Sequence, residues 1–154
     1  MTDEFGHDIC PASTLLYEKA KFLFRRNKIA ETEELVEKAY GLNPYNWRLN
    51  YLRLQLFHKQ KKLSDLEVAE QLLQIDSKGH ERLDIMTFAA ELYSSMEEDQ
   101  YQQKCKEMLQ SIRTMDPEFQ RAKILQKRLQ RKSQAQKTPK EEKKKGFFSS
   151  LFRK

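Results

Sequence analysis

Three histidines and two cysteines are the side chains of this 154-residue chain that could bind a metal ion or act as nucleophiles. His7, His58 and His80 are scattered, and none has a second ligand at the spacing that a metal site requires. Cys10 and Cys105 are also not spaced for a metal or a disulfide, so we expect two reduced thiols in a cytosolic protein. The sequence therefore predicts neither a metal site nor a bound cofactor.

Motifs of the common enzyme classes do not occur in the sequence. There is no glycine-rich phosphate-binding loop, no serine-nucleophile elbow and no HExxH zinc motif. Pairs of acidic residues lie where helices are expected to start or in linkers, and there a solvated role is the default. We therefore expect a noncatalytic protein.

The composition favours an all-α protein. Charged residues make up 34% and apolar residues 38% of the chain, so the core must form from narrow apolar stripes on polar helices. Four glycines and four prolines are too few for a turn-rich β protein. The length suits one domain with tails, and we expect a flexible N-terminus at 1–12, a helical domain at 13–134 and a flexible tail at 135–154.

Three similar triplets divide the expected helical domain into segments. Each triplet has an apolar residue, then Asn or Asp, then Pro or Ser: Leu42-Asn43-Pro44, Ile75-Asp76-Ser77 and Met115-Asp116-Pro117. Their last residues are 33 and 40 positions apart (77 − 44 and 117 − 77), and such a period is typical of stacked helical hairpins.

Two apolar stripes with helical spacing flank a polar break within each segment. The breaks lie near 25–28, 58–62 and 97–99. Ser64 to Glu67 has the form of a capping box, which would start the second helix of the second hairpin. Asp116-Pro117 predicts the start of a last helix, which would reach about Ser133 and cover the open end of the stack.

One stretch carries a conflicting signal. Leu52, Leu54 and Leu56 alternate as they would in a strand. The apolar pattern around them is too long for an isolated strand, and a helix packed on two sides also shows two apolar faces. We therefore expect a helix here.

The hairpins resemble tetratricopeptide (TPR) repeats, a family of 34-residue helical hairpins with small or apolar residues at set places and a closing proline. In the first repeat, counted from Ser13, the matching residues are Leu16, Ala20, Leu23, Val36, Ala39 and Pro44. Lys19, Thr32 and Arg53 depart from the family pattern. The resemblance covers about 13–117 and implies an α-solenoid of about three degenerate hairpins with a C-terminal capping helix.

In this family, the first helix of each hairpin lines a concave groove that holds a segment of a partner protein. The resemblance places nine residues in such a groove: Tyr17, Lys21, Phe24, Arg25, Trp47, Asn50, Leu54, Phe57 and His58. Those from 47 onward also share a helical face distinct from that of the neighbouring leucines. Aromatic and cationic groups would suit a segment with apolar anchors and acidic neighbours. The alternative is that Trp47 and Phe57 pack between repeats or under the C-terminal helix. A chaperone-tail clamp is disfavoured, because Lys21 stands where that clamp needs Asn.

The net charge of +6 conceals two regions of opposite charge. Residues 118–154 hold 13 Lys or Arg and three Glu, a balance of +10, so residues 1–117 carry −4 (6 − 10). The first residues lack the apolar stretch of a secretory signal, and no apolar run approaches the ~20 residues that span a bilayer. We expect a cytoplasmic protein that meets any membrane from its inner face.

The end of the basic region combines cationic and aromatic residues. Nine of them form a candidate membrane-binding segment: Lys143, Lys144, Lys145, Phe147, Phe148, Leu151, Phe152, Arg153 and Lys154. The four apolar members would share one face of a short helix, and each basic residue near an anionic surface contributes about 1 kcal/mol. This pattern favours reversible membrane docking. The alternatives are docking into a groove of another protein, nonspecific nucleic-acid binding through phosphates, or no role.

These features together predict a noncatalytic adaptor or scaffold that holds another protein in its groove and docks to a membrane through its tail. An alternative is a TPR-type chaperone for secreted proteins, which in some bacteria has three such repeats at similar length. The acidic body fits that class and the basic aromatic tail does not. A nucleic-acid-associated adaptor that uses the basic tail is the third hypothesis.

Overall fold

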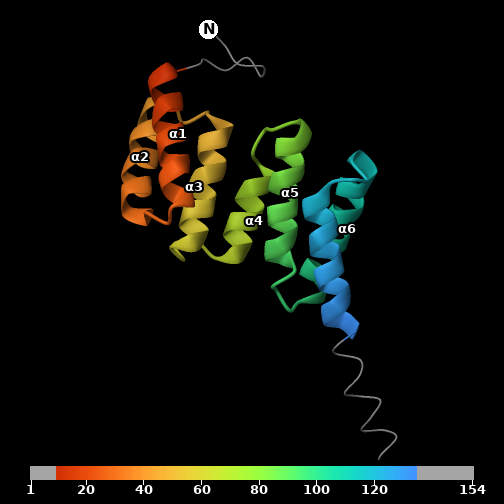
Figure 1. The fold of residues 1–154 in the computed structure, drawn as a ribbon. Coiled ribbons are helices and arrows are strands. Elements are labelled where there is room, and N and C mark those ends of the chain that lie inside the picture. The colour runs from red at the N-terminus through yellow and green to blue at the C-terminus, as the bar shows by residue number, and fades with distance from the viewer. Residues whose placement is uncertain (1–9, 135–154) are drawn as a thin grey trace, which may run out of the picture.

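The computed structural model describes residues 10–134, and within this range the chain is helical and has no strand. Six helices follow in order: α1 (Pro11–Arg25), α2 (Ile29–Leu42), α3 (Trp47–Lys59), α4 (Asp65–Leu73), α5 (Gly79–Tyr93) and α6 (Asp99–Met115). A further helix, here called the C-terminal helix, covers 120–134. The all-α prediction is confirmed, and the polar breaks fall at the expected links (Figure 1).

Helix α4 begins where the sequence predicts. The Ser64 side chain accepts a hydrogen bond from the Glu67 backbone N–H, and the Glu67 carboxylate accepts one from the Ser64 backbone N–H. This reciprocal capping box satisfies two backbone donors that the first turn of a helix leaves free. It suits a helix of only nine residues, which has few internal hydrogen bonds of its own.

The links that follow α1 and α3 have the same backbone geometry. Asn27 and Lys61 adopt positive φ values of 60° and 56°. In each link the next residue donates its backbone N–H five residues back: Lys28 to the Leu23 carbonyl at 3.0 Å, and Lys62 to the Phe57 carbonyl at 2.9 Å. This is the hydrogen-bond pattern of a Schellman cap. Because Lys61 follows Asn27 by 34 residues, the two hairpins share one register at this turn.

The C-terminal helix begins later than predicted. The sequence suggested Pro117 as its first residue, but 117–118 form a turn and the helix starts at 120. The Asp116 side chain accepts a hydrogen bond from the Glu118 backbone N–H at 2.9 Å, and the Phe119 N–H donates to the Asp116 carbonyl at 3.2 Å. Asp116 thus closes a tight turn after α6, of which it is the C-cap residue, and it is not the N-cap of the C-terminal helix.

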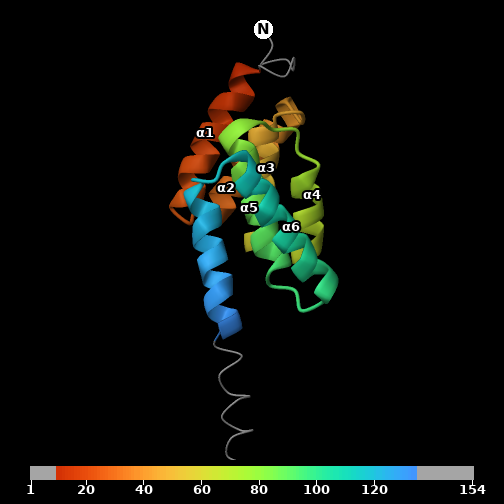
Figure 2. The same ribbon diagram turned by 90° about the vertical axis from the view of Figure 1, so that its right-hand side faces the viewer.

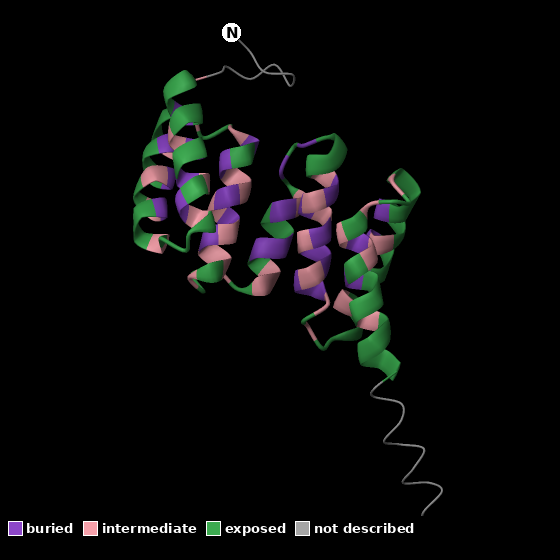
Figure 3. Cartoon of the chain, in the orientation of Figure 1, coloured by how far each residue is buried: buried purple, intermediate pink, exposed green. Residues whose placement is uncertain are grey.

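Helix α3 lies between two parts of the hydrophobic core. Its residues Leu49, Leu52 and Leu56 join α1 and α2 in one cluster. Its residues Trp47 and Leu54 join a second cluster, which α4, α5, α6 and the C-terminal helix complete. Figure 3 shows buried residues on several sides of the helices in the middle of the row. The alternating leucines are explained by this packing, because both sides of α3 are covered.

The helices pack in chain order. Each of α1 to α5 contacts the helix that follows it, and α1 also contacts α3. Figure 2 shows α1 and the C-terminal helix toward one side of the row and α4 toward the other. Helix α1 and the C-terminal helix lie at opposite ends of the row (Figure 1). Residues from α1, α3 and α5 line one pocket on the surface of this row.

Candidate functional site

Aromatic side chains of α3 and α5 meet on this face. The Phe88 ring of α5 lies 5.5 Å from the His58 ring and 6.4 Å from the Tyr51 ring, both measured between centroids. Both contacts are edge-to-face, which is a favourable arrangement for aromatic pairs. Phe24 of α1 approaches from the other side, with Lys59 Nζ 5.2 Å from its ring centroid.

These rings line a pocket where α1, α3 and α5 come together. The pocket has a volume of about 850 Å³, and the turn between α3 and α4 forms its rim. Its lining includes three rings and three lysines, together with Asp65: Phe24, His58, Phe88, Lys59, Lys61 and Lys62. We refer to it as the basic aromatic pocket. Its floor is apolar and its rim is cationic, so it suits an apolar group attached to negative charge.

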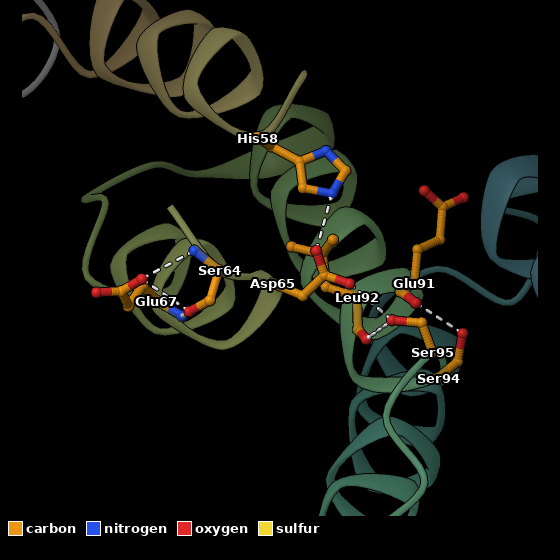
Figure 4. A network of polar contacts seen from close by, with 8 residues as sticks. All are labelled: His58, Ser64, Asp65, Glu67, Glu91, Leu92, Ser94 and Ser95. Carbon is orange, nitrogen blue, oxygen red and sulfur yellow. Dashed lines mark hydrogen bonds and ion pairs between the residues drawn. The ribbon is translucent and has the colours of Figure 1, made fainter. Parts of the chain in front are cut away.

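Hydrogen bonds hold one wall of the pocket in place (Figure 4). His58 Nε2 lies 3.2 Å from Asp65 Oδ1, and the Ser95 hydroxyl lies 2.9 Å from Asp65 Oδ2. Asp65 thereby connects the end of α3, the start of α4 and the end of α5. Because three elements share one carboxylate, these hydrogen bonds restrict the movement of this wall.

The turn between α3 and α4 is also tied to α2. Glu33 accepts hydrogen bonds from Lys62 and from Gln60, the latter at 2.7 Å. The hydrogen bond from Lys62 is the main reason that the pKa of Glu33 lies below its usual value, and that from Gln60 adds to it. The pair neutralises Lys62, so the positive charge of the rim rests on Lys59 and Lys61.

The same face continues toward the C-terminal helix through Arg121. Its guanidinium lies 3.2 Å from Asp84 and 3.3 Å from Glu91, both on α5. Burial raises the pKa of the nearby Tyr51 hydroxyl, and Arg121 limits that rise. Arg121 thus offsets part of the negative charge of the two acidic residues and ties the last helix to α5.

The nine residues predicted to line a groove differ in how far they are exposed and in whether they line a pocket. Tyr17, Trp47 and Leu54 are buried, with 7%, 6% and 6% of their surface exposed, and they pack in the core. Trp47 and Leu54 also contribute to the lining of a surface hollow that contains Asn50. Phe57 is half-buried beneath Arg53 and Lys62, which lie 4.6 and 5.7 Å from its ring centroid.

Two of the nine residues, Phe24 and His58, line the basic aromatic pocket. Lys21 is half-buried and Arg25 is exposed. Asn50 donates a hydrogen bond to the Pro44 carbonyl at 2.9 Å. It lines a separate hollow of about 330 Å³ between the link that follows α2 and the end of α4.

Sequence reasoning missed Tyr51, Gln55 and Phe88. Tyr51, Gln55 and His58 follow Tyr17, Lys21 and Phe24 by 34 residues, which is the repeat length of the family that the hairpins resemble. The prediction aligned Pro44 with Ser77, 33 residues apart, and so displaced the second repeat by one position. The paired turns at 27 and 61 reveal the 34-residue register.

The remaining candidates carry no chemistry that the structure brings together. Among residues 10–134 no cluster of three or more potential metal ligands occurs. Cys105 is buried, and desolvation raises the pKa of its thiol. No helix in the described range is long and apolar enough to cross a bilayer. The nine residues of the candidate membrane-binding segment lie outside the described residues.

No protein-family model, curated protein or solved structure matches this chain significantly.

Proposed function

We propose that this chain is a noncatalytic adaptor, built as a TPR-like α-solenoid, that binds a segment of another protein. Two observations support the repeat architecture. Each helix from α1 to α5 packs against its successor, as in repeat proteins, where a unit contacts only its neighbours. The turns at Asn27 and Lys61 also repeat one backbone geometry at a 34-residue spacing.

The basic aromatic pocket is the observation that carries the binding role. Phe24 and Phe88 are half-buried on a surface to which α1, α3 and α5 all contribute. Side chains on successive helices of such a row are well placed to hold an extended or helical segment. Aromatic residues in pockets are frequent anchors of protein interfaces.

The basic aromatic C-terminus supplies the second part of the proposal, a reversible attachment to anionic membrane. Lys143 to Lys145 precede the aromatic residues, and Arg153-Lys154 follow them. Partial insertion of four large apolar side chains, at about 1.5–3 kcal/mol each for full burial, adds to the attraction of the basic residues. Glu141 and Glu142 reduce it. The balance fits reversible docking at a cytoplasmic membrane face.

Partner capture tests the binding role. The tagged full chain is compared with Phe88→Ala and with Lys59→Glu/Lys61→Glu, and bound proteins are identified. Lys127→Glu/Arg131→Glu is the matched control, because it reverses two charges at exposed positions on the C-terminal helix. We expect the pocket variants to lose proteins that wild type and control retain. Identical proteins in equal yield from all four would contradict the role.

Sedimentation with liposomes tests the membrane role. The full chain should sediment with anionic liposomes and stay in solution with neutral ones, and a version ending at Gln136 should stay in solution with both. Added salt should release the full chain, because the attraction of exposed charges is screened. Failure of the full chain to sediment with anionic liposomes would rule out this part of the proposal.

A further inference from the structure

We infer that the basic aromatic pocket recognises an acidic peptide segment carrying one aromatic side chain, which enters between Phe24 and Phe88. This inference rests on the proposed role of the chain as a partner-binding protein and specifies the chemistry of the partner. The segment is one of another protein. Its carboxylates would face Lys59 and Lys61, and its ring would contact the apolar floor.

The charge of the rim is the first argument. Lys59 and Lys61 form no ion pair with any residue in the range 10–134, whereas Lys62 is paired with Glu33. The one carboxylate that lines the pocket, Asp65, already accepts from His58 and Ser95. Lys59 lies over the Phe24 ring and Asp65 keeps its negative charge, so the three lysines exceed the carboxylates Asp65 and Glu33 by one positive charge, which attracts carboxylates from outside.

The apolar floor is the second argument. Phe24, Phe88 and Leu63 line the pocket, and all three are half-buried. An aromatic side chain gains free energy there by removing its own surface and theirs from water. Its ring can also form a further edge-to-face contact with Phe88, as Tyr51 and His58 already do.

The backbone of Lys61 is the third argument. Its φ of 56° lies in the left-handed region, where Gly or Asn is usual at the end of a helix and where other residues are strained. The equivalent residue of the first hairpin is Asn27. A lysine at this strained position places a cation at the pocket rim, and local strain of this kind accompanies functional sites.

The alternatives fit less well. The C-terminal region of this chain, with a balance of +10 over 118–154, carries the same sign of charge as the rim, so it is repelled. The first backbone amides of α4, which could bind phosphate, are partly taken by the capping box.

Fluorescence anisotropy with the full chain tests this inference. The probe is a fluorescein-labelled peptide of sequence Glu-Asp-Glu-Phe-Glu-Asp-Glu in buffer of low ionic strength. Three unlabelled competitors are added: the same peptide, one with Gly in place of Phe, and one with Lys in place of every acidic residue. We expect displacement by the first, displacement only at about tenfold higher concentration by the second, and none by the third.

Variants of the chain test whether the labelled peptide binds in the basic aromatic pocket. Lys59→Glu/Lys61→Glu should weaken binding by about tenfold or more, and Phe88→Ala by several-fold. The control Lys127→Glu/Arg131→Glu makes the same change in net charge and should bind as wild type does. Circular dichroism of each variant, compared with wild type, verifies that the fold is kept. Equal weakening by the pocket and control pairs would overturn the inference, because it would indicate attraction by net charge alone.

Two further results would overturn the inference: no binding of the peptide to wild type, or tighter binding of a labelled oligo-dT strand that the pocket variants abolish. The proposed adaptor role is judged separately by partner capture. If the pocket variants lose captured partners while the acidic peptide fails to bind, this face binds proteins of another chemistry. If the peptide binds in the pocket-dependent way described, the inference stands whatever the capture experiment yields.

Discussion

Lys61 combines its proposed role in binding an acidic peptide with a cost in the stability of the folded chain. In the left-handed region the Cβ of Lys61 comes too close to the backbone. This contact raises the free energy of the folded chain by about 1–2 kcal/mol relative to the right-handed region, a cost that glycine does not have. The corresponding turn after α1 uses Asn27, which tolerates this conformation better. The lysine is therefore not explained by the turn itself.

Lys61→Gly should raise the free energy of unfolding by up to about 1 kcal/mol, because glycine adopts φ 56° without strain. The same variant should bind the acidic phenylalanine peptide less tightly than wild type. Urea denaturation and anisotropy on one preparation measure both effects. Asn27→Gly is the matched control, and we expect a smaller gain in stability from it and no change in peptide binding. A Lys61→Gly protein less stable than wild type would contradict the strain argument.

Glu33 makes the link between α2 and the turn after α3 sensitive to acid. Its pKa is lowered in the folded chain, chiefly by the hydrogen bond from Lys62. A lowered carboxylate pKa means that its stabilising contribution is fully present above the usual value of 4.5 and is lost as the pH falls through the lower folded value. Because Glu33 is only half-buried, we expect a small effect that salt weakens.

A double-mutant cycle checks this pH dependence. Glu33→Gln, Lys62→Met and the double variant are unfolded with urea at pH 7 and again at pH 3. The coupling between the two side chains should be stabilising at pH 7 and smaller at pH 3, because protonation of the carboxylate becomes more favourable as the pH falls toward its lowered pKa. A coupling free energy of equal size at pH 7 and pH 3 would show that the ion pair between Glu33 and Lys62 is not the source of the coupling.

At the scale of the helices, α3 has the central position in packing. Leu49 is fully buried between α1 and α2, while Trp47 and Leu54 reach the opposite cluster. Leu49→Ala should therefore lower the free energy of unfolding by about 3 kcal/mol, as expected for a cavity in a packed core. Leu15→Ala, at a position 73% exposed on α1, should change it little. Urea denaturation followed by circular dichroism measures both, and equal losses would contradict the packing described here.

The helices could be predicted because their boundaries depend on local signals. Ser64 and Glu67 form the expected capping box, and the polar breaks become the links. The face that each helix presents depends on register, which local signals specify poorly. A shift of one residue rotates a helix by about 100°, so the misaligned second repeat put Trp47 and Leu54 on the groove side. Because α3 is apolar on both sides, its own pattern could not reveal the error.

Only part of the pocket could be predicted from the sequence. Phe24 and His58 were predicted as binding residues and line it. Phe88 was missed, because the third segment departs from the 34-residue spacing: its triplet lies 40 residues after the second one. The contribution of α5 to the pocket follows from how α5 packs beside α3, and that is a tertiary property.

At the scale of the whole molecule, the two parts of the proposed function rest on different parts of the chain. The basic aromatic pocket draws on α1, α3 and α5, and the C-terminal helix lies at the end of the row opposite α1 (Figure 1). The candidate membrane-binding segment at 143–154 is outside the described residues. The two experiments proposed above change these parts independently.

The buried thiol of Cys105 has a practical consequence at this scale. Cys105 is 1% exposed in the cluster that joins α5, α6 and the C-terminal helix, whereas Cys10 is partly exposed at the start of α1. A thiol reagent should therefore modify Cys10 within the mixing time and Cys105 only when the end of the row opens. Arg121→Ala, which removes the tie between the C-terminal helix and α5, should speed the second reaction and leave the first unchanged. The rate at which Cys105 is modified therefore measures how often the last helices open, and no added label is needed.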